Sequence, residues 1–143
     1  MRRPFLPDAN VFLHALNAGS AHHAPCRRWL EKAHADGRTI LVNDLTECAL
    51  LRVSTLPRVA FAPMEFALKF WQALLDSPFV RRAVPGESHR AHLLRFIEDL
   101  NLTGNDINDG WLAALALDHR AILVSTDRGF ARFPGLDWIE PAE

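Results

Sequence analysis

Four acidic residues lie where their carboxylates are well placed to do chemistry. Asp8 and Asp127 each follow a short apolar run, whereas Glu47 and Asp109 each fall in the first turn of an expected helix. Carboxylates gathered in one place repel one another, and Mg²⁺ or Mn²⁺ relieves that repulsion by binding oxygen ligands. Such a site lowers the pKa of a bound water and holds phosphate oxygens, which is the equipment for phosphodiester hydrolysis.

Each of these acids also has an ordinary structural interpretation. The segments 44–47 and 106–109 have the outline of a capping box, with Asp44 and Asp106 as the caps, and Asp8 could cap the helix that follows it. Asp127 could belong to a turn. Taken together, however, all four acids lie at strand ends or helix starts, and this regular order favours one shared site.

The elements that must position these acids alternate along the chain, which predicts an α/β fold with a mostly parallel sheet. Strands are expected at 3–7, 39–42 and 121–124, with an edge strand through 138–139 and a doubtful one at 79–84, where two arginines interrupt the apolar run. Helices are expected at 10–17, 22–35, from 43–44 onward, 64–75, 87–100 and 105–118. Because ligands bind at the carboxyl edge of a parallel sheet, Asp8, Glu47 and Asp127 should converge there, and Asp109 should join them from its helix.

Composition limits the remaining possibilities. A chain of 143 residues fits one domain over 1–143, and a net charge of −1 argues against binding nucleic acid by charge alone. Cys26 and Cys48 are too few for a disulfide framework and are expected to be reduced thiols. No run of about 20 apolar residues appears, and Asp8 interrupts the first segment, so we expect a cytoplasmic protein without membrane contact.

Four segments together resemble the PIN-domain ribonucleases. They are LPDANVFL at 6–13, LTECALLRV at 45–53, the stretch 104–116, and LVSTDRGF at 123–130, with FPGL at 133–136 as the usual ending. The resemblance spans nearly the whole chain, and its size suits the VapC-type toxins. It implies a Rossmann-like α/β/α sandwich with a central, mostly parallel sheet. It also implies an endoribonuclease that cleaves structured RNA, such as transfer or ribosomal RNA, by a metal-activated water.

The resemblance assigns roles residue by residue. Asp8, Glu47, Asp109 and Asp127 match the catalytic and metal-binding acids for Mg²⁺ or Mn²⁺, although Asp106 could take the place of Asp109. Ser125 matches a frequent hydroxyl position, and Asn10 could orient Asp8 or only cap a helix. The implied partners are an RNA substrate, a VapB-type antitoxin and a second copy of the chain in a homodimer.

Basic side chains and histidines allow further interpretations. Arg81-Arg82, Arg128 and Arg132 could contact RNA phosphates or simply be solvated, and Arg128 is favoured because it adjoins Asp127. A zinc site at His14, His22 and His23 lacks a fourth ligand at a recognisable spacing, so solvated or capping roles are preferred.

Competing functions differ in what they require. A phospho-acceptor receiver needs a lysine near the last strands, and Lys32 and Lys69 come too early. A haloacid-type phosphatase needs Asp-x-Asp after the first strand, and position 10 is Asn. A non-catalytic PIN module and a PIN nuclease outside any toxin–antitoxin pair both stay open.

Overall fold

Short apolar segments pair as the centre of a five-stranded sheet in the computed structural model, which describes residues 2–59 and 61–141. The strands are β1 (Phe5–Pro7), β2 (Ile40–Val42), β3 (Val80–Arg82), β4 (Ile122–Val124) and β5 (Trp138–Ile139). Their order in the sheet is β3-β2-β1-β4-β5, and every pair is parallel. The expected sheet is confirmed, and it is wholly rather than mostly parallel.

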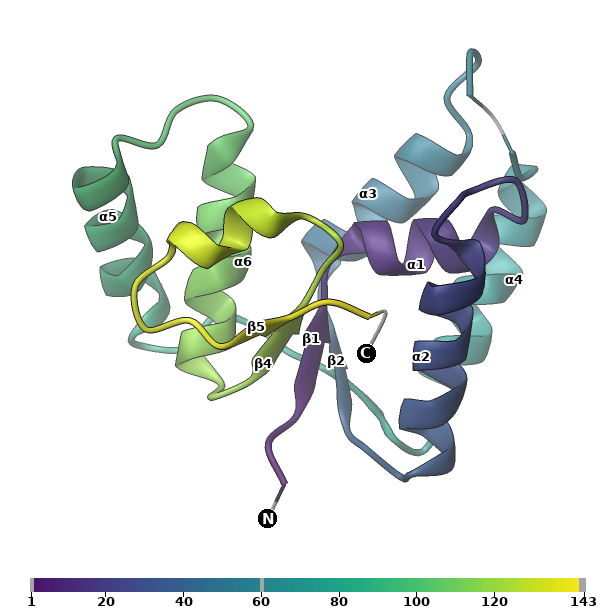
Figure 1. Ribbon diagram of the computed structural model, residues 1–143, viewed down its shortest axis with the longest axis horizontal. Coiled ribbons are helices and arrows are strands. Elements are labelled where there is room, and N and C mark those ends of the chain that lie inside the picture. Colours follow the sequence, from purple (N-terminus) through teal and green to yellow (C-terminus); the bar gives the residue numbers. More distant parts are fainter. Residues whose placement is uncertain (1, 60, 142–143) are drawn as a thin grey trace.

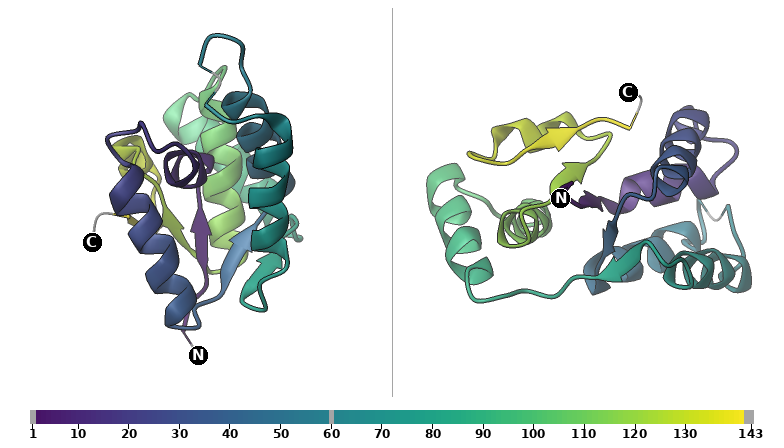
Figure 2. Two further views of the ribbon diagram at one scale, coloured as in Figure 1. Left: turned by 90° about the vertical axis from the view of Figure 1, so that its right-hand side faces the viewer. Right: turned by 90° about the horizontal axis from the view of Figure 1, so that it is seen from below.

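Two groups of helices cover the sheet from opposite sides (Figures 1 and 2). The first group is α1 (Ala9–Leu16), α2 (His23–Ala35), α3 (Asp44–Ser54) and α4 (Met64–Leu75). The second is α5 (His89–Leu100), α6 (Asp106–Asp118) and the short 3₁₀ helix η1 (Arg128–Arg132). The chain therefore forms the expected Rossmann-like α/β/α sandwich.

Alternate strand residues build two separate hydrophobic cores. Leu6 and Leu123 pack with residues of α5, α6 and η1, whereas their neighbours Phe5 and Val124 pack with residues of α1 to α4. Successive side chains of a strand point to opposite faces, so a strand covered on both faces must be apolar throughout. This explains why the central strands are continuous apolar runs rather than alternating patterns.

The doubtful strand at 79–84 is confirmed as β3, shortened to Val80–Arg82. It pairs with β2 alone and lies at an edge of the sheet, where Arg81 and Arg82 are exposed. Charged side chains are common on edge strands because they discourage pairing with another chain. The arginines that made the strand doubtful are therefore explained by its position.

Two expected helix caps were wrong by one residue. The cap of α3 is Asn43, whose Oδ1 accepts a hydrogen bond from Thr46 N at 2.9 Å, and Asp44 is already helical. Likewise α6 is preceded by Asn105, which makes no side-chain cap bond, and Asp106 lies inside the helix. The other helices begin and end within two residues of the expected bounds.

The strand order places a crevice beside β1. From β1 the chain proceeds to β2 on one side, and β4 later pairs with β1 on the other side. Ligands of open parallel sheets bind outside the carboxyl ends of the strands where the order reverses in this way. Asp8 directly follows β1, so it lies at this switch point. Separately, no helix within the described residues is long and apolar enough to cross a membrane.

Candidate carboxylate site

Asp8 is fixed at the carboxyl end of β1 by four hydrogen bonds. Its backbone N–H donates to Val124 O at 2.8 Å, which ties it to β4. Oδ1 accepts from Ala9 N at 2.7 Å, so Asp8 is the N-cap of α1, as expected. Oδ2 accepts from Ser125 Oγ at 3.0 Å and from Asn10 Nδ2 at 3.1 Å. Both carboxylate oxygens are therefore held in one orientation.

Ser125 is the centre of this network. It is fully buried directly after β4, and its hydroxyl donates to Asp8 while accepting from Asn10 Nδ2 at 2.9 Å and from Asp127 N at 3.0 Å. Asn10 in turn accepts from Thr126 N at 3.3 Å. The suggestion that Asn10 contacts Asp8 holds, and the two carboxyl ends of β1 and β4 are connected through side chains.

Asp8 carries charge that its surroundings oppose. Burial raises the pKa of its carboxyl group, and the nearby Asp127 raises it further, while the hydrogen bonds from Ser125 and Ala9 lower it. Within the described residues, no Lys, Arg or His side chain forms an ion pair with Asp8 or Asp127. A buried carboxylate without a counter-ion favours protonation or a bound cation.

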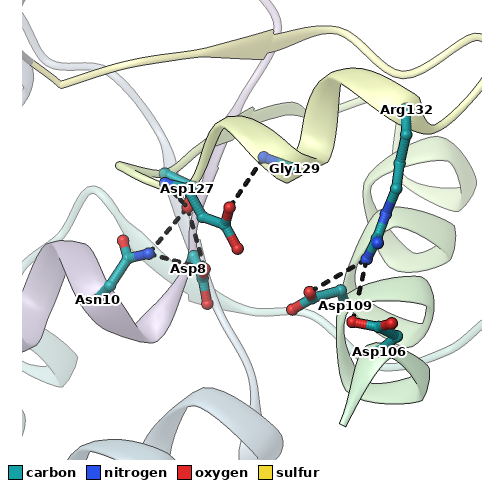
Figure 3. A network of polar contacts seen from close by, with 8 residues as sticks. Asp8, Asn10, Asp106, Asp109, Asp127, Gly129 and Arg132 are labelled. Atoms are coloured by element: carbon teal, nitrogen blue, oxygen red, sulfur yellow. Dashed lines mark hydrogen bonds and ion pairs between the residues drawn. The ribbon is translucent and has the colours of Figure 1, made fainter. Parts of the chain in front are cut away.

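Asp127 opens η1 and approaches from the same direction. Its Oδ1 accepts from Gly129 N at 2.8 Å, so it is also the turn residue considered above. The second carboxylate oxygen of Asp127 does not take part in this turn and faces the site beside Asp8 (Figure 3). A capping role and a role in the site are thus compatible at this position.

Asp109 reaches the site from the first turn of α6. The pKa of its carboxyl group is raised to about 6, chiefly by burial and also by the charges of Asp8, Asp127 and Asp106, against the lowering effect of Arg132. Asp109 therefore lies within electrostatic reach of Asp8 and Asp127. Asp106 is the more exposed of the two acids, at 53% of its side chain against 30% for Asp109. The geometry favours Asp109 over Asp106 as the member of the cluster.

Arg132 is the basic residue that faces these acids. Its Nη2 lies 3.4 Å from both Asp106 Oδ1 and Asp109 Oδ2 (Figure 3). Arg128, which the sequence favoured, instead pairs with Glu140 at 3.1 Å and is 82% exposed. Adjacency to Asp127 in sequence does not set the direction of the Arg128 side chain, because η1 brings its last residue, not its first, back over α6. The preference for Arg128 as an RNA contact stays a prediction.

Glu47 is the expected acid that the structure links least to the others. It lies in the first turn of α3, where its backbone N–H donates to Asn43 O at 3.0 Å, and it is partly buried. In the described part of the chain, no hydrogen bond or ion pair connects its carboxylate to the other three acids. The start of α3 places Glu47 at the expected carboxyl edge of the sheet, but its side chain makes no hydrogen bond to the network around Asp8 in the described part of the chain.

The donor set was tested against a divalent cation. Within residues 2–59 and 61–141, no three Asp, Glu, His or Cys side chains are arranged to hold a metal ion as they stand. The chemistry nevertheless fits, because Asp8, Asp109 and Asp127 come from three elements to the switch point of the sheet. There Asp127 raises the pKa of Asp8, and both raise the pKa of Asp109. Mg²⁺ keeps several waters and needs only one or two direct carboxylates.

The three histidines are used locally. His14 Nδ1 lies 2.6 Å from Ser20 Oγ, and His23 Nδ1 donates to His14 O at 2.9 Å. His22 precedes α2 and stacks at a tilt on His14. These contacts are local and of the solvated or capping kind preferred above, although His22 makes no side-chain cap bond.

Comparison with known proteins defines the family. The sequence profile of the PIN domain matches residues 5–136. The chain therefore belongs to the PIN-domain family, which confirms the resemblance of its four motifs. Within that family, Ribonuclease VapC43 from Mycobacterium tuberculosis is 37% identical over 139 residues, covering 95% of this chain and 94% of the relative.

Solved structures agree on the fold. VapBC-1 from nontypeable Haemophilus influenzae superposes with a TM-score of 0.72 at 16% identity, covering 97% of this chain and 98% of that one. VapC20 from Mycobacterium tuberculosis, described as a sarcin-ricin loop cleaving toxin, gives a TM-score of 0.68 at 15% identity, covering 93% and 98%. At these identities the likeness shows the shared architecture.

Proposed function

We propose that this chain is a metal-dependent endoribonuclease and the toxin of a VapBC-type toxin–antitoxin pair. The observation that carries the proposal is the convergence of Asp8, Asp109 and Asp127 at the switch point of the sheet. Asp8 and Asp127 have no basic partner among the described residues, and the nearby acids raise the pKa values of Asp8 and Asp109. The family relationship to VapC ribonucleases supports the same function.

In this proposal Asp8, Asp109 and Asp127 would hold Mg²⁺ or Mn²⁺, directly or through water, and Glu47 would complete the set from α3. A bound cation of this kind lowers the pKa of a coordinated water and stabilises negative charge on phosphate oxygens. Ser125 and Asn10 keep the Asp8 carboxylate in one orientation, through bonds of 3.0 Å and 3.1 Å. Preorganised ligands of this type need no rearrangement when charge develops on the phosphate.

We propose a structured RNA as substrate. Support comes from VapC20, which shares the fold and is described as cleaving the sarcin-ricin loop. A net charge of −1 supplies little general attraction to RNA, so selectivity would come from shape and from contacts around the crevice. Transfer RNA and ribosomal RNA loops are the two classes to test.

The antitoxin proposal rests on a second surface, whose lining includes none of the four acids. A groove of about 640 Å³ runs between α2 and α4 and is lined mainly by apolar residues, among them Leu30, Phe66, Phe70 and Leu74. Phe66 is 54% exposed. Apolar surface of this kind marks protein interaction sites, and the superposed Haemophilus influenzae structure is a VapBC complex. We infer a VapB-type antitoxin as the partner.

The test is cleavage of purified transfer RNA and ribosomal RNA by the isolated protein in Mg²⁺, in Mn²⁺ and in EDTA. We expect endonucleolytic products that require the cation and are lost in Asp8→Asn. Asp137→Asn is the matched control, because Asp137 pairs with Arg3 and takes no part in the carboxylate site. Cleavage that persists in EDTA or in Asp8→Asn would contradict the proposed mechanism.

A protein that does not cleave RNA in this assay would contradict the proposed function. If the folded, antitoxin-free protein binds RNA but cuts neither class in any cation, the chain acts as a binding module, and the nuclease proposal is overturned. Co-expression with the small gene adjacent to its own tests the pairing, since a cognate antitoxin should copurify and suppress cleavage. A nuclease that no neighbouring product binds or inhibits lies outside a toxin–antitoxin pair.

A further inference from the structure

Arg132 occupies an unusual position for a surface arginine. It ends η1 and lies over the first turn of α6, where Nη2 is 3.4 Å from Asp106 Oδ1 and 3.4 Å from Asp109 Oδ2 (Figure 3). Its guanidinium carbon is 5.0 Å from the centre of the Phe133 ring. Phe133 is buried, so the ring is a fixed surface on which the side chain rests.

Binding of a divalent cation at the three aspartates would change the electrostatic balance around Arg132. Asp109 is within electrostatic reach of Asp8 and Asp127 on one side and is paired with Arg132 on the other. A cation shared by the three aspartates would supply the positive charge that Arg132 now provides. It would also repel the guanidinium across a few ångströms. Arg132 then loses one of its two carboxylate partners.

We propose that Arg132 is an exchangeable counter-ion, which neutralises Asp106 and Asp109 before a cation binds and passes to an RNA phosphate once the cation takes Asp109. The inference rests on the proposed function. Guanidinium groups pair with phosphate through two parallel hydrogen bonds, as they do with carboxylate, so the same fork serves both partners. The Arg132 side chain is 36% exposed, so part of its surface is accessible to a phosphate.

The affinities for the cation and for RNA should therefore be coupled through Arg132. Before the cation binds, the aspartates hold Arg132, and it contributes little to RNA affinity. After the cation binds, Arg132 is free to contribute a phosphate contact. A fixed basic residue would contribute equally in both states. By linkage, Arg132 must also weaken cation binding, because it competes for Asp109.

The experiment measures binding of labelled bulk transfer RNA to wild type and Arg132→Gln, in Ca²⁺ and in EDTA, with gels confirming that the RNA stays intact. We expect the substitution to weaken RNA binding about fivefold in Ca²⁺ and to lower the salt dependence by about one phosphate contact. In EDTA we expect a loss below about twofold. Equal losses in Ca²⁺ and EDTA, or no loss in either, would overturn the inference.

Arg128→Gln is the matched control. It removes the same charge from the same short helix, but Arg128 pairs with Glu140 and does not face the acids. Whatever RNA affinity it contributes should be equal in Ca²⁺ and EDTA. A difference between the two conditions as large as that of Arg132→Gln would show a general charge effect and would contradict a specific exchange at Arg132.

A calorimetric titration with Mn²⁺ alone completes the test. We expect Arg132→Gln to bind Mn²⁺ about fivefold more tightly than wild type, and Arg128→Gln to match wild type. If Arg132→Gln binds Mn²⁺ with unchanged affinity while wild type binds Mn²⁺ and cleaves RNA, the exchange is contradicted and the proposed function is not affected. No Mn²⁺ binding to wild type would instead remove the proposed metal dependence itself.

Discussion

The two sides of the carboxylate site are built differently. On the side of β1 and β4, Asp8 is held by Ser125 and Asn10 within a network of bonds between 2.7 and 3.1 Å. On the side of α6 and η1, Asp109 has one ion-pair partner among the described residues, Arg132 at 3.4 Å. The first side is preorganised, whereas the second is held by an ion pair that can open.

This difference explains why the site fits a cation without yet forming a cage for it. The side of β1 and β4 supplies a fixed carboxylate between two central strands, where backbone positions are set by the sheet. The side of α6 and η1 supplies an acid that must exchange Arg132 for the cation. Substitutions on the two sides should therefore have different consequences, and the expected effects decrease from Asp8 to Asp106.

The largest effect is expected for Asp8→Asn. It removes the charge of the best-held carboxylate while keeping its shape, and we expect RNA cleavage to fall on the order of 100-fold or more. Initial rates in Mn²⁺ measure the loss. Retention of most activity would mean that the side of β1 and β4 has a structural role, and that the side of α6 and η1 carries the catalysis.

Ser125→Ala tests whether the network, and not only the acid, matters. The buried hydroxyl has three partners, and its removal leaves Asp8, Asn10 and Asp127 N with one fewer partner each. We expect about 1–3 kcal/mol of lost stability and cleavage reduced about 10- to 100-fold. Thermal melts and rates measure both. Ser77→Ala, which removes a hydroxyl from the α4–β3 connection, should leave cleavage unchanged.

Asp109→Asn tests the looser side through pH. The pKa of Asp109 is raised to about 6 in the folded protein from an ordinary 3.8, so the folded state binds this proton more tightly than the unfolded state does. Its contribution stabilises the fold below pH 4 or so and is lost as the pH rises through about 6. In EDTA we therefore expect Asp109→Asn to exceed wild type in stability at pH 7.5 and to match it near pH 4.

The magnitude follows from the same value. A change of this size corresponds to at most about 3 kcal/mol, and partial exposure of Asp109 lowers the expectation to about 1 kcal/mol. That difference is about 2–4 °C in melting temperature for a chain of this size. A stability difference that grows toward low pH would have the wrong sign and would contradict the assigned cause.

Asp106→Asn should have the smallest effect. Asp106 is half exposed, pairs with Arg132 at 3.4 Å and lies on the far side of Asp109 from Asp8. We expect cleavage within about threefold of wild type, because solvent screens an exposed pair. A loss as large as the one expected for Asp8→Asn in the same assay would exchange the roles of Asp106 and Asp109.

Sequence reasoning predicted the fixed side of the site better than the loose side. Asp8 and Asp127 follow apolar strands whose order is recognisable from the chain, and parallel pairing then brings them to one edge. The contact of Asn10 with Asp8 was also foreseen, since the two residues are two apart at a helix start. These features depend on local pattern and on rules of sheet topology.

The loose side depends on contacts that local patterns do not encode. Asp106 and Asp109 are one turn apart on α6, and tertiary structure distinguishes them: Asp109 is the less exposed, and Asp8 and Asp127 raise its pKa. The five residues of η1 resembled a plain turn, so the return of Arg132 over α6 was not visible, and Arg128 was preferred. Glu47 reaches the right edge with its helix, but the direction of its side chain is set by tertiary contacts.

The most direct test of the central claim is the structure of crystals soaked in Mn²⁺, with anomalous scattering recorded near the manganese edge. The account predicts one strong peak in the crevice, bound to Asp8 and to at least one of Asp109 and Asp127, with Arg132 displaced from Asp109. A peak elsewhere, or none at saturating Mn²⁺, would contradict the assignment of these carboxylates as the metal site.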